Sequence, residues 1–149
     1  MLIRSLTRIA LTLAVAMSCT CAFATCALDH SVFRDSANRG FTLEFSPATG
    51  DSAMVIAVAQ LKHVRRGTIL KFDVGQSNGY GSVFLERTGG ADPQPHYAYF
   101  FDANLRESRS NAATWVFVSG LGAADYYETR QAPQVGDTLW KFERCKIHP

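Results

Sequence analysis

The fold is decided by residues 52–74, which read SAMVIAVAQLKHVRRGTILKFDV. Residues 52–66 carry two periodicities at once. The β-branched run Val55-Ile-Ala-Val58 favours a strand that turns through Arg65-Arg66-Gly67 into a second strand, Thr68–Val74. The same residues also place an apolar stripe on one face of a helix. We favour the strand, because a dense β-branched run fits a pleated sheet better than a helix.

Segments of strand character recur on both sides of this hairpin, and turns rich in Gly, Pro, Asn and Asp separate them. The further strands that we expect are residues 41–45, 81–87, 97–101, 114–118 and 138–144. Regularly spaced short strands predict an all-β domain, either a single antiparallel β-sandwich or a small β-barrel of about seven or eight strands. If residues 52–66 form a helix instead, the fold is α+β, with that helix packed on an antiparallel sheet. Residues 119–125, which contain two glycines, are expected to form a flexible loop.

The first 24 residues have the order of a cleavable signal peptide, in a style typical of bacteria. A positively charged start is followed by the apolar run Ile9–Met17 and the small-residue triplet Ala22-Phe-Ala24. The apolar run is shorter than the about 20 residues that span a bilayer. We therefore expect residues 1–24 to be removed, and residues 25–149 to form a single β-rich exported domain. Such a domain is periplasmic or extracellular and has no transmembrane segment.

The cysteine count predicts a disulfide between the two ends of this domain. Cleavage after residue 24 removes Cys19 and Cys21 and leaves Cys26 and Cys145, which an oxidising compartment favours joining. A lipoprotein acylated at Cys19 or Cys26 is the weaker alternative, because either form has an odd number of remaining cysteines. Two cysteines without a histidine at ligand spacing do not make a metal site. We predict neither a metal nor another cofactor.

The charge balance argues against nucleic acid as a partner. The whole chain has 15 Lys and Arg residues and 13 Asp and Glu residues. Arg4 and Arg8 leave with the signal peptide, so the domain that remains is neutral. A neutral domain without a long basic run binds nucleic acid and anionic membranes poorly.

The sequence contains short stretches that resemble catalytic motifs, but the residues around them do not fit the motifs. Residues 75–79, GQSNG, match the G-x-S-x-G nucleophile elbow around Ser77, but a strand follows where the elbow needs a helix. A hairpin turn rich in Gly and Asn explains these residues better. The basic stretch around His63 indicates an exposed face or hairpin tip. None of the histidines shows metal-binding spacing: His30, His63, His96 and His148.

Aromatic residues gather in the second half of the chain. Tyr97, Tyr99 and Phe101 share one face of their predicted strand, and Trp115 lies in the next one. Such a set is most often part of the core, but it can also anchor a partner or stack on a sugar.

From these observations we predict that the chain is a non-enzymatic exported binding protein, such as an inhibitor or an immunity protein. We expect it to contact a protein partner. One alternative is a β-barrel that binds a small hydrophobic or sugar ligand in a mouth lined by Tyr97, Tyr99 and Trp115. A second alternative is a small exported enzyme whose site is assembled only in three dimensions.

Overall fold

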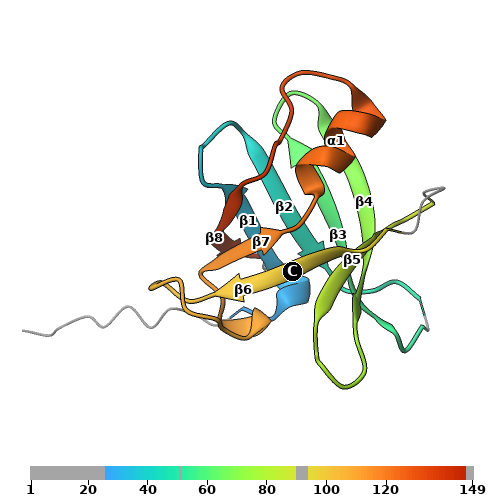
Figure 1. The fold of residues 1–149 in the computed structure, drawn as a ribbon, viewed down its shortest axis with the longest axis vertical. Helices are drawn as coiled ribbons and strands as arrows, with labels where there is room; N and C mark the ends of the chain where they lie inside the picture. Colours follow the sequence, from blue (N-terminus) through green and yellow to red (C-terminus); the bar gives the residue numbers. More distant parts are fainter. Residues whose placement is uncertain (1–25, 51, 90–93, 147–149) are drawn as a thin grey trace, which may run out of the picture.

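Eight antiparallel strands close into a barrel in which each strand pairs with its neighbours in sequence and β1 pairs with β8 (Figure 1). The structure is a computed structural model that describes residues 26–50, 52–89 and 94–146. The expected signal peptide, residues 1–24, lies outside the described residues. The strands are β1 (Ser31–Asp35), β2 (Phe41–Ser46), β3 (Val55–His63), β4 (Gly67–Gln76), β5 (Val83–Arg87), β6 (His96–Phe101), β7 (Trp115–Val118) and β8 (Leu139–Cys145).

The all-β prediction is confirmed, and the architecture is the small barrel. Residues 55–63 form the strand β3, so the helix considered for residues 52–66 is wrong. The helical stripe would have buried Met54 and Val64, whose exposed fractions are 67% and 80%. Ala59 and Leu61 point inward instead, in the alternation of a strand with one buried face.

The strand β1 was not among the expected strands. Its pairing with β8 shifts register between Val32 and Phe33, and both side chains are buried. A β-bulge of this kind interrupts the alternation of buried and exposed residues by which a strand is recognised in a sequence.

The α-helix in the described residues, α1 (Leu121–Thr129), lies at the end of the barrel where β3 turns into β4 (Figure 1). It replaces the flexible loop expected for residues 119–125, and that expectation is wrong. No side chain caps the helix, so its own sequence stabilises it weakly. Leu121 and Val135 are fully buried and fasten the helix and the segment after it to the barrel.

The interior of the barrel is filled by side chains. Eight strands give an interior that packed side chains can fill. Every strand contributes to one hydrophobic cluster, whose largest fully buried members are Trp140, Phe33, Phe41, Phe45 and Phe72. Any ligand of the described residues therefore has to bind outside the core.

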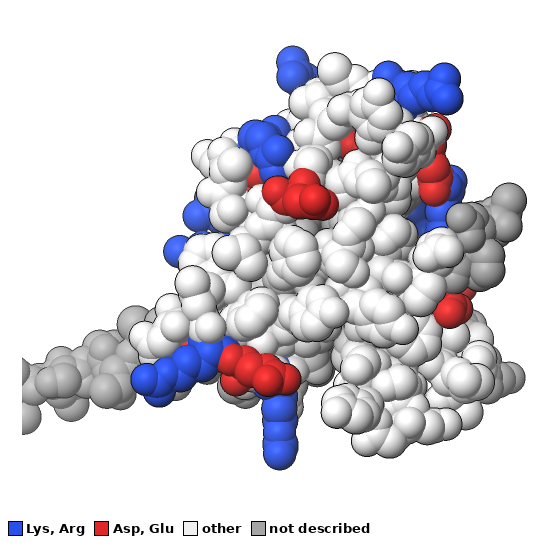
Figure 2. Space-filling model, in the orientation of Figure 1, with Lys and Arg blue, Asp and Glu red and all other residues white. Residues whose placement is uncertain are grey.

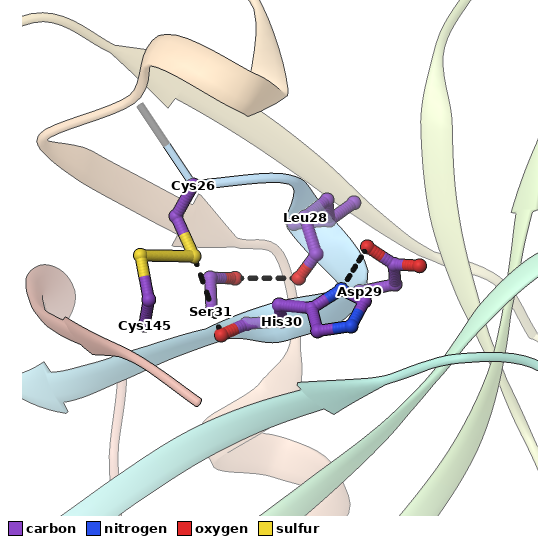
Figure 3. The surroundings of a disulfide bond; sticks show 6 residues. All are labelled: Cys26, Leu28, Asp29, His30, Ser31 and Cys145. Atoms are coloured by element: carbon purple, nitrogen blue, oxygen red, sulfur yellow. Dashed lines mark hydrogen bonds and ion pairs between the residues drawn. A yellow bond between two sulfur atoms is a disulfide. The ribbon is translucent and has the colours of Figure 1, made fainter. Parts of the chain in front are cut away.

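A disulfide joins Cys26 to Cys145, with their Cα atoms 5.8 Å apart and a sequence separation of 119 (Figure 3). Cys26 precedes the short 3-10 helix η1 (Leu28–His30), and Cys145 ends β8. The Ser31 hydroxyl donates to the Leu28 carbonyl over 2.6 Å, which fixes η1 on the start of β1. The bond thus fastens both ends of the described chain to one corner of the barrel. No helix within the described ranges is long and apolar enough to cross a membrane.

Candidate binding surface

The outer surface of the barrel is mostly polar over β2, β3 and β4. Lys62 Nζ donates to Glu44 Oε2 over 2.8 Å, and Lys146 Nζ lies 3.5 Å from the same oxygen. Burial alone would raise the pKa of Glu44. The hydrogen bond and charge of Lys62, together with the charge of Lys146, outweigh burial and hold this pKa below its ordinary value. Glu44 is therefore ionised and paired, and this side of the barrel is a hydrated surface.

The outer surface of β5 to β8 is aromatic instead. We call it the aromatic face, and its outward side chains are Phe84, Tyr97, Tyr99, Phe101, Trp115, Phe117 and Leu139. Strand pairing makes the set continuous. Phe84 lies opposite Tyr97, Tyr99 lies opposite Phe117, and Trp115 lies opposite Phe101. Figure 2, viewed from the same side as Figure 1, shows a broad uncharged surface where β5, β6 and β7 lie.

The rings of the aromatic face are packed against one another and still reach solvent. The ring centroids of Phe84 and Tyr97 are 6.4 Å apart, as are those of Tyr99 and Phe117. Tyr97 and Tyr99 keep exposed fractions of 43% and 52%. A Cβ atom at Gly75 would lie 2.5 Å from the Phe84 ring, so glycine allows this ring to lie directly on the β4 backbone. The side chains of the aromatic face are therefore already packed in the free protein.

Charged groups stand at the border of the aromatic face. Lys141 on β8 holds its ammonium 5.3 Å from the Trp115 ring centroid, within the range of a cation–π contact. Glu86 follows Phe84 outward on β5. An uncharged centre with charged groups around it is the distribution found in protein interfaces.

An open hollow of about 800 Å³ adjoins the aromatic face at the seam between β5 and β6. The two strands pair only from Leu85 opposite His96 to Val83 opposite Ala98. Beyond this point they part, and the connection between β6 and β7 covers the edge of β6 through a bridge between Phe101 and Glu107. We call this space the seam hollow. Its lining includes Tyr80, Tyr97, Tyr99, Phe101, Glu107, Arg109 and Asn111.

No protein-family model, curated protein or solved structure matches this chain.

The structure brings Tyr97 and Tyr99 together and places Trp115 on the same surface, outside the lining of the seam hollow. All three side chains project from the outer wall of the barrel, while their neighbours Ala98 and Val116 point inward. These three side chains therefore do not line the interior of the barrel. The sequence reasoning missed Phe84 and Phe117, which the alternation of their strands could have placed on the same side.

Ser77 lies in the turn between β4 and β5, in agreement with the hairpin interpretation of residues 75–79. Its Oγ accepts a hydrogen bond from the Ser82 N–H over 3.0 Å, and its own N–H donates to the Ser82 carbonyl. A strand follows this turn, so the serine is not held at the start of a helix as in a nucleophile elbow.

His63 ends β3 at the β3–β4 hairpin, as expected, but its side chain is buried, with an exposed fraction of 3%, so the exposure expected for it is wrong. Its Nδ1 accepts from the Arg65 N–H, which leaves Nε2 to donate to the Arg39 carbonyl, both over 3.3 Å. The ring also packs against Phe41, with centroids 4.6 Å apart. His63 therefore connects two turns at one end of the barrel. No group of three or more potential metal-ligating side chains occurs in the part of the chain that the structure describes.

Asp125, which is fully buried, belongs to a structural network rather than to a cleft. Its carboxylate accepts from Arg66 Nη2 over 3.0 Å, from the Thr129 hydroxyl over 2.7 Å and from the Val135 N–H over 2.9 Å. Burial would raise the pKa of Asp125, but these hydrogen bonds and the Arg66 charge hold it below its ordinary value. The network fastens α1 to the turn between β3 and β4.

Proposed function

We propose that this chain is a non-enzymatic exported binding protein that engages another exported protein through the aromatic face. The observation that carries the proposal is the continuous surface of outward aromatic side chains on β5 to β7, with charged groups at its border. The outer wall over β2 to β4 is mostly polar, so the aromatic surface is a local feature of one side. Contiguous exposed apolar surface on a small domain marks a site of interaction.

The chemistry of the aromatic face favours a protein partner. Tyrosine and tryptophan are among the residues that contribute most to protein–protein binding, because a large ring is buried while its polar group finds a hydrogen bond. Tyr97 and Tyr99 are about half exposed and stand in a packed layer, so little side-chain freedom is lost on binding. A filled barrel with a broad outward surface suits a partner of matching size better than a small enclosed ligand.

The terminal disulfide supports an exported setting for this interaction. Disulfides form and persist in oxidising compartments, and residues 1–24 have the sequence of a secretory signal. An inhibitor or an immunity protein acts by binding its partner protein.

Capture of the partner by matched variants tests the proposal. The disulfide-bonded protein is immobilised as wild type, Tyr99→Ser and Tyr127→Ser, and the exported fraction of the native host is passed over each. Tyr127 is the control, because it is an exposed tyrosine on α1, outside the aromatic face, with an exposed fraction of 72%. We expect one protein to bind wild type and Tyr127→Ser in equal amount, and Tyr99→Ser at least about tenfold more weakly.

Equal recovery of that protein on all three surfaces would contradict the aromatic face as the contact. Recovery that is lost with Tyr127→Ser and kept with Tyr99→Ser would move the contact to α1. Thermal unfolding of each variant in parallel shows that any loss is not a loss of fold.

A further inference from the structure

The segment that follows β6 forms one wall of the seam hollow, and hydrogen bonds fix its backbone. Asp102 Oδ1 accepts hydrogen bonds from the backbone N–H groups of Asn104 and Arg106, over 2.7 Å and 3.0 Å. Leu105 takes a left-handed backbone conformation, with φ of 59°. The Ser108 N–H then donates to the Phe100 carbonyl over 2.9 Å, which holds the following residues beside β6. Side chains from residues 107–111 are therefore presented to the hollow by a fixed backbone.

These side chains are not engaged elsewhere. Within the described residues, no hydrogen bond or ion pair uses the carboxylate of Glu107, the guanidinium of Arg109 or the amide of Asn111. All three line the hollow, as does Ser110. They offer both hydrogen-bond donors and acceptors to whatever occupies the space.

Other parts of the lining of the hollow are aromatic. Tyr97 and Tyr99 line it from β6, and Tyr80 reaches it from the β4–β5 turn with an exposed fraction of 96%. The volume of about 800 Å³ lies within the range of about 300–1,000 Å³ typical of ligand sites. Aromatic rings with a few converging polar groups form the usual lining of such sites.

The charges of the hollow favour an uncharged ligand. The lining has one carboxylate, Glu107, and one guanidinium, Arg109, so its net charge is zero and it favours a ligand of neither sign. A sugar satisfies both residues, because each hydroxyl group donates and accepts, while the C–H faces of its ring pack on tyrosine. An extended peptide fits less well, since the barrel is closed and the Phe100 carbonyl already accepts from Ser108.

We propose that the seam hollow is a binding site for a neutral oligosaccharide. Tyr97 and Tyr99 pack against the sugar rings, and Glu107, Arg109 and Asn111 bind the hydroxyl groups. The site goes beyond the proposed protein contact, with which it shares Tyr97, Tyr99 and Phe101 but not Trp115 or Phe117.

Titration calorimetry with defined neutral oligosaccharides tests the site. The probes are hexasaccharides of β-1,4-linked glucose, α-1,4-linked glucose, β-1,4-linked N-acetylglucosamine and β-1,4-linked xylose. We expect at least one to bind the full disulfide-bonded protein. Asn111→Ala is expected to weaken it about fivefold, the value of a lost hydrogen bond, and Tyr99→Ala at least about tenfold.

Two variants separate this site from the protein contact. Trp115→Ala is expected to leave the affinity for the sugar unchanged and to weaken capture of the protein partner. Asn111→Ala is expected to do the opposite. The failure of either proposal is therefore visible without the other.

Three results would overturn the saccharide site. One is the absence of binding by all the probes at millimolar concentration. Another is binding that Asn111→Ala and Glu107→Gln leave unchanged. The third is a preference for a charged saccharide, or for an unstructured peptide used as a competitor, over the neutral probes.

Discussion

Arg66 and Asp125 form the most buried ion pair among the described residues. The two side chains have exposed fractions of 10% and 0%. Arg66 Nη1 also donates to the Pro133 carbonyl over 2.6 Å. Arg66 therefore connects the β3–β4 turn to both α1 and the segment that follows it.

Removal of Arg66 leaves the Asp125 carboxylate buried without its charge partner. Arg66→Met is therefore expected to lower the free energy of unfolding by about 3 kcal/mol, measured by urea denaturation. The double variant Arg66→Met/Asp125→Asn is expected to be more stable than Arg66→Met alone, because no unpaired charge is left. A double variant as unstable as the sum of its single variants would contradict the pairing.

Acid is expected to destabilise the protein through Asp35 and Asp125. Burial would raise the pKa of each, but hydrogen bonds outweigh it, from Arg39 and Phe41 to Asp35 and from Arg66, Thr129 and Val135 to Asp125. Both pKa values lie below the ordinary 3.8 in the folded state. Their stabilisation is thus complete above pH 3.8 and is lost as the pH falls further. Melting temperatures across this range should show a decline that is shallower in Asp125→Asn.

At the scale of elements, β3 and α1 show what local sequence can reveal. The strand β3 is visible in the sequence because its side chains alternate between core and solvent and are β-branched at one end. The helix α1 is not visible, because its contacts come from elsewhere. Arg66, which holds it, is 59 residues away from Asp125. Tertiary contacts of this kind override weak local preference.

The close approach of α1 to the loop before β8 predicts the effect of one glycine. A Cβ at Gly122 would lie 2.7 Å from the Cα of Gly136, and backbone cannot move aside as a side chain can. Gly122→Ala is therefore expected to lower the free energy of unfolding by about 1–2 kcal/mol, although alanine favours a helix. Gly50→Ala is the control, because no atom lies within 4 Å of its Cβ position. Equal stability of both variants by urea denaturation would contradict the packing of α1.

At the scale of the whole molecule, the barrel closes between β1 and β8, and the disulfide closes the chain at the same corner. The pairing of Cys26 with Cys145 could be predicted once residues 1–24 are taken as a cleaved signal peptide, because Cys19 and Cys21 leave with it. The division of the outer surface into a polar side and an aromatic side could not be predicted, because it depends on which residues of β5 to β8 lie opposite one another. Tyr97 and Tyr99 were visible as a pair on one strand, whereas their contacts with Phe84 and Phe117 arise only from strand register.

Loss of the disulfide is expected to weaken the protein without changing its fold. The bond closes a segment with a sequence separation of 119, for which chain entropy gives at most about 4–5 kcal/mol. Cys26→Ser/Cys145→Ser should therefore unfold at lower urea concentration, while circular dichroism of the native state stays unchanged, because hydrogen bonds still join β1 to β8. An unaltered midpoint would show that the bond contributes nothing to stability.

Hydroxyl-radical footprinting of the partner complex locates the contact, because it reports the solvent exposure of individual aromatic side chains. Tyr97, Tyr99 and Trp115 are expected to become protected when the partner binds. Tyr126 and Tyr127 on α1, with exposed fractions of 53% and 72%, should react as in the free protein. Protection of the two α1 tyrosines with unchanged reactivity on β6 and β7 would contradict the aromatic face as the binding surface.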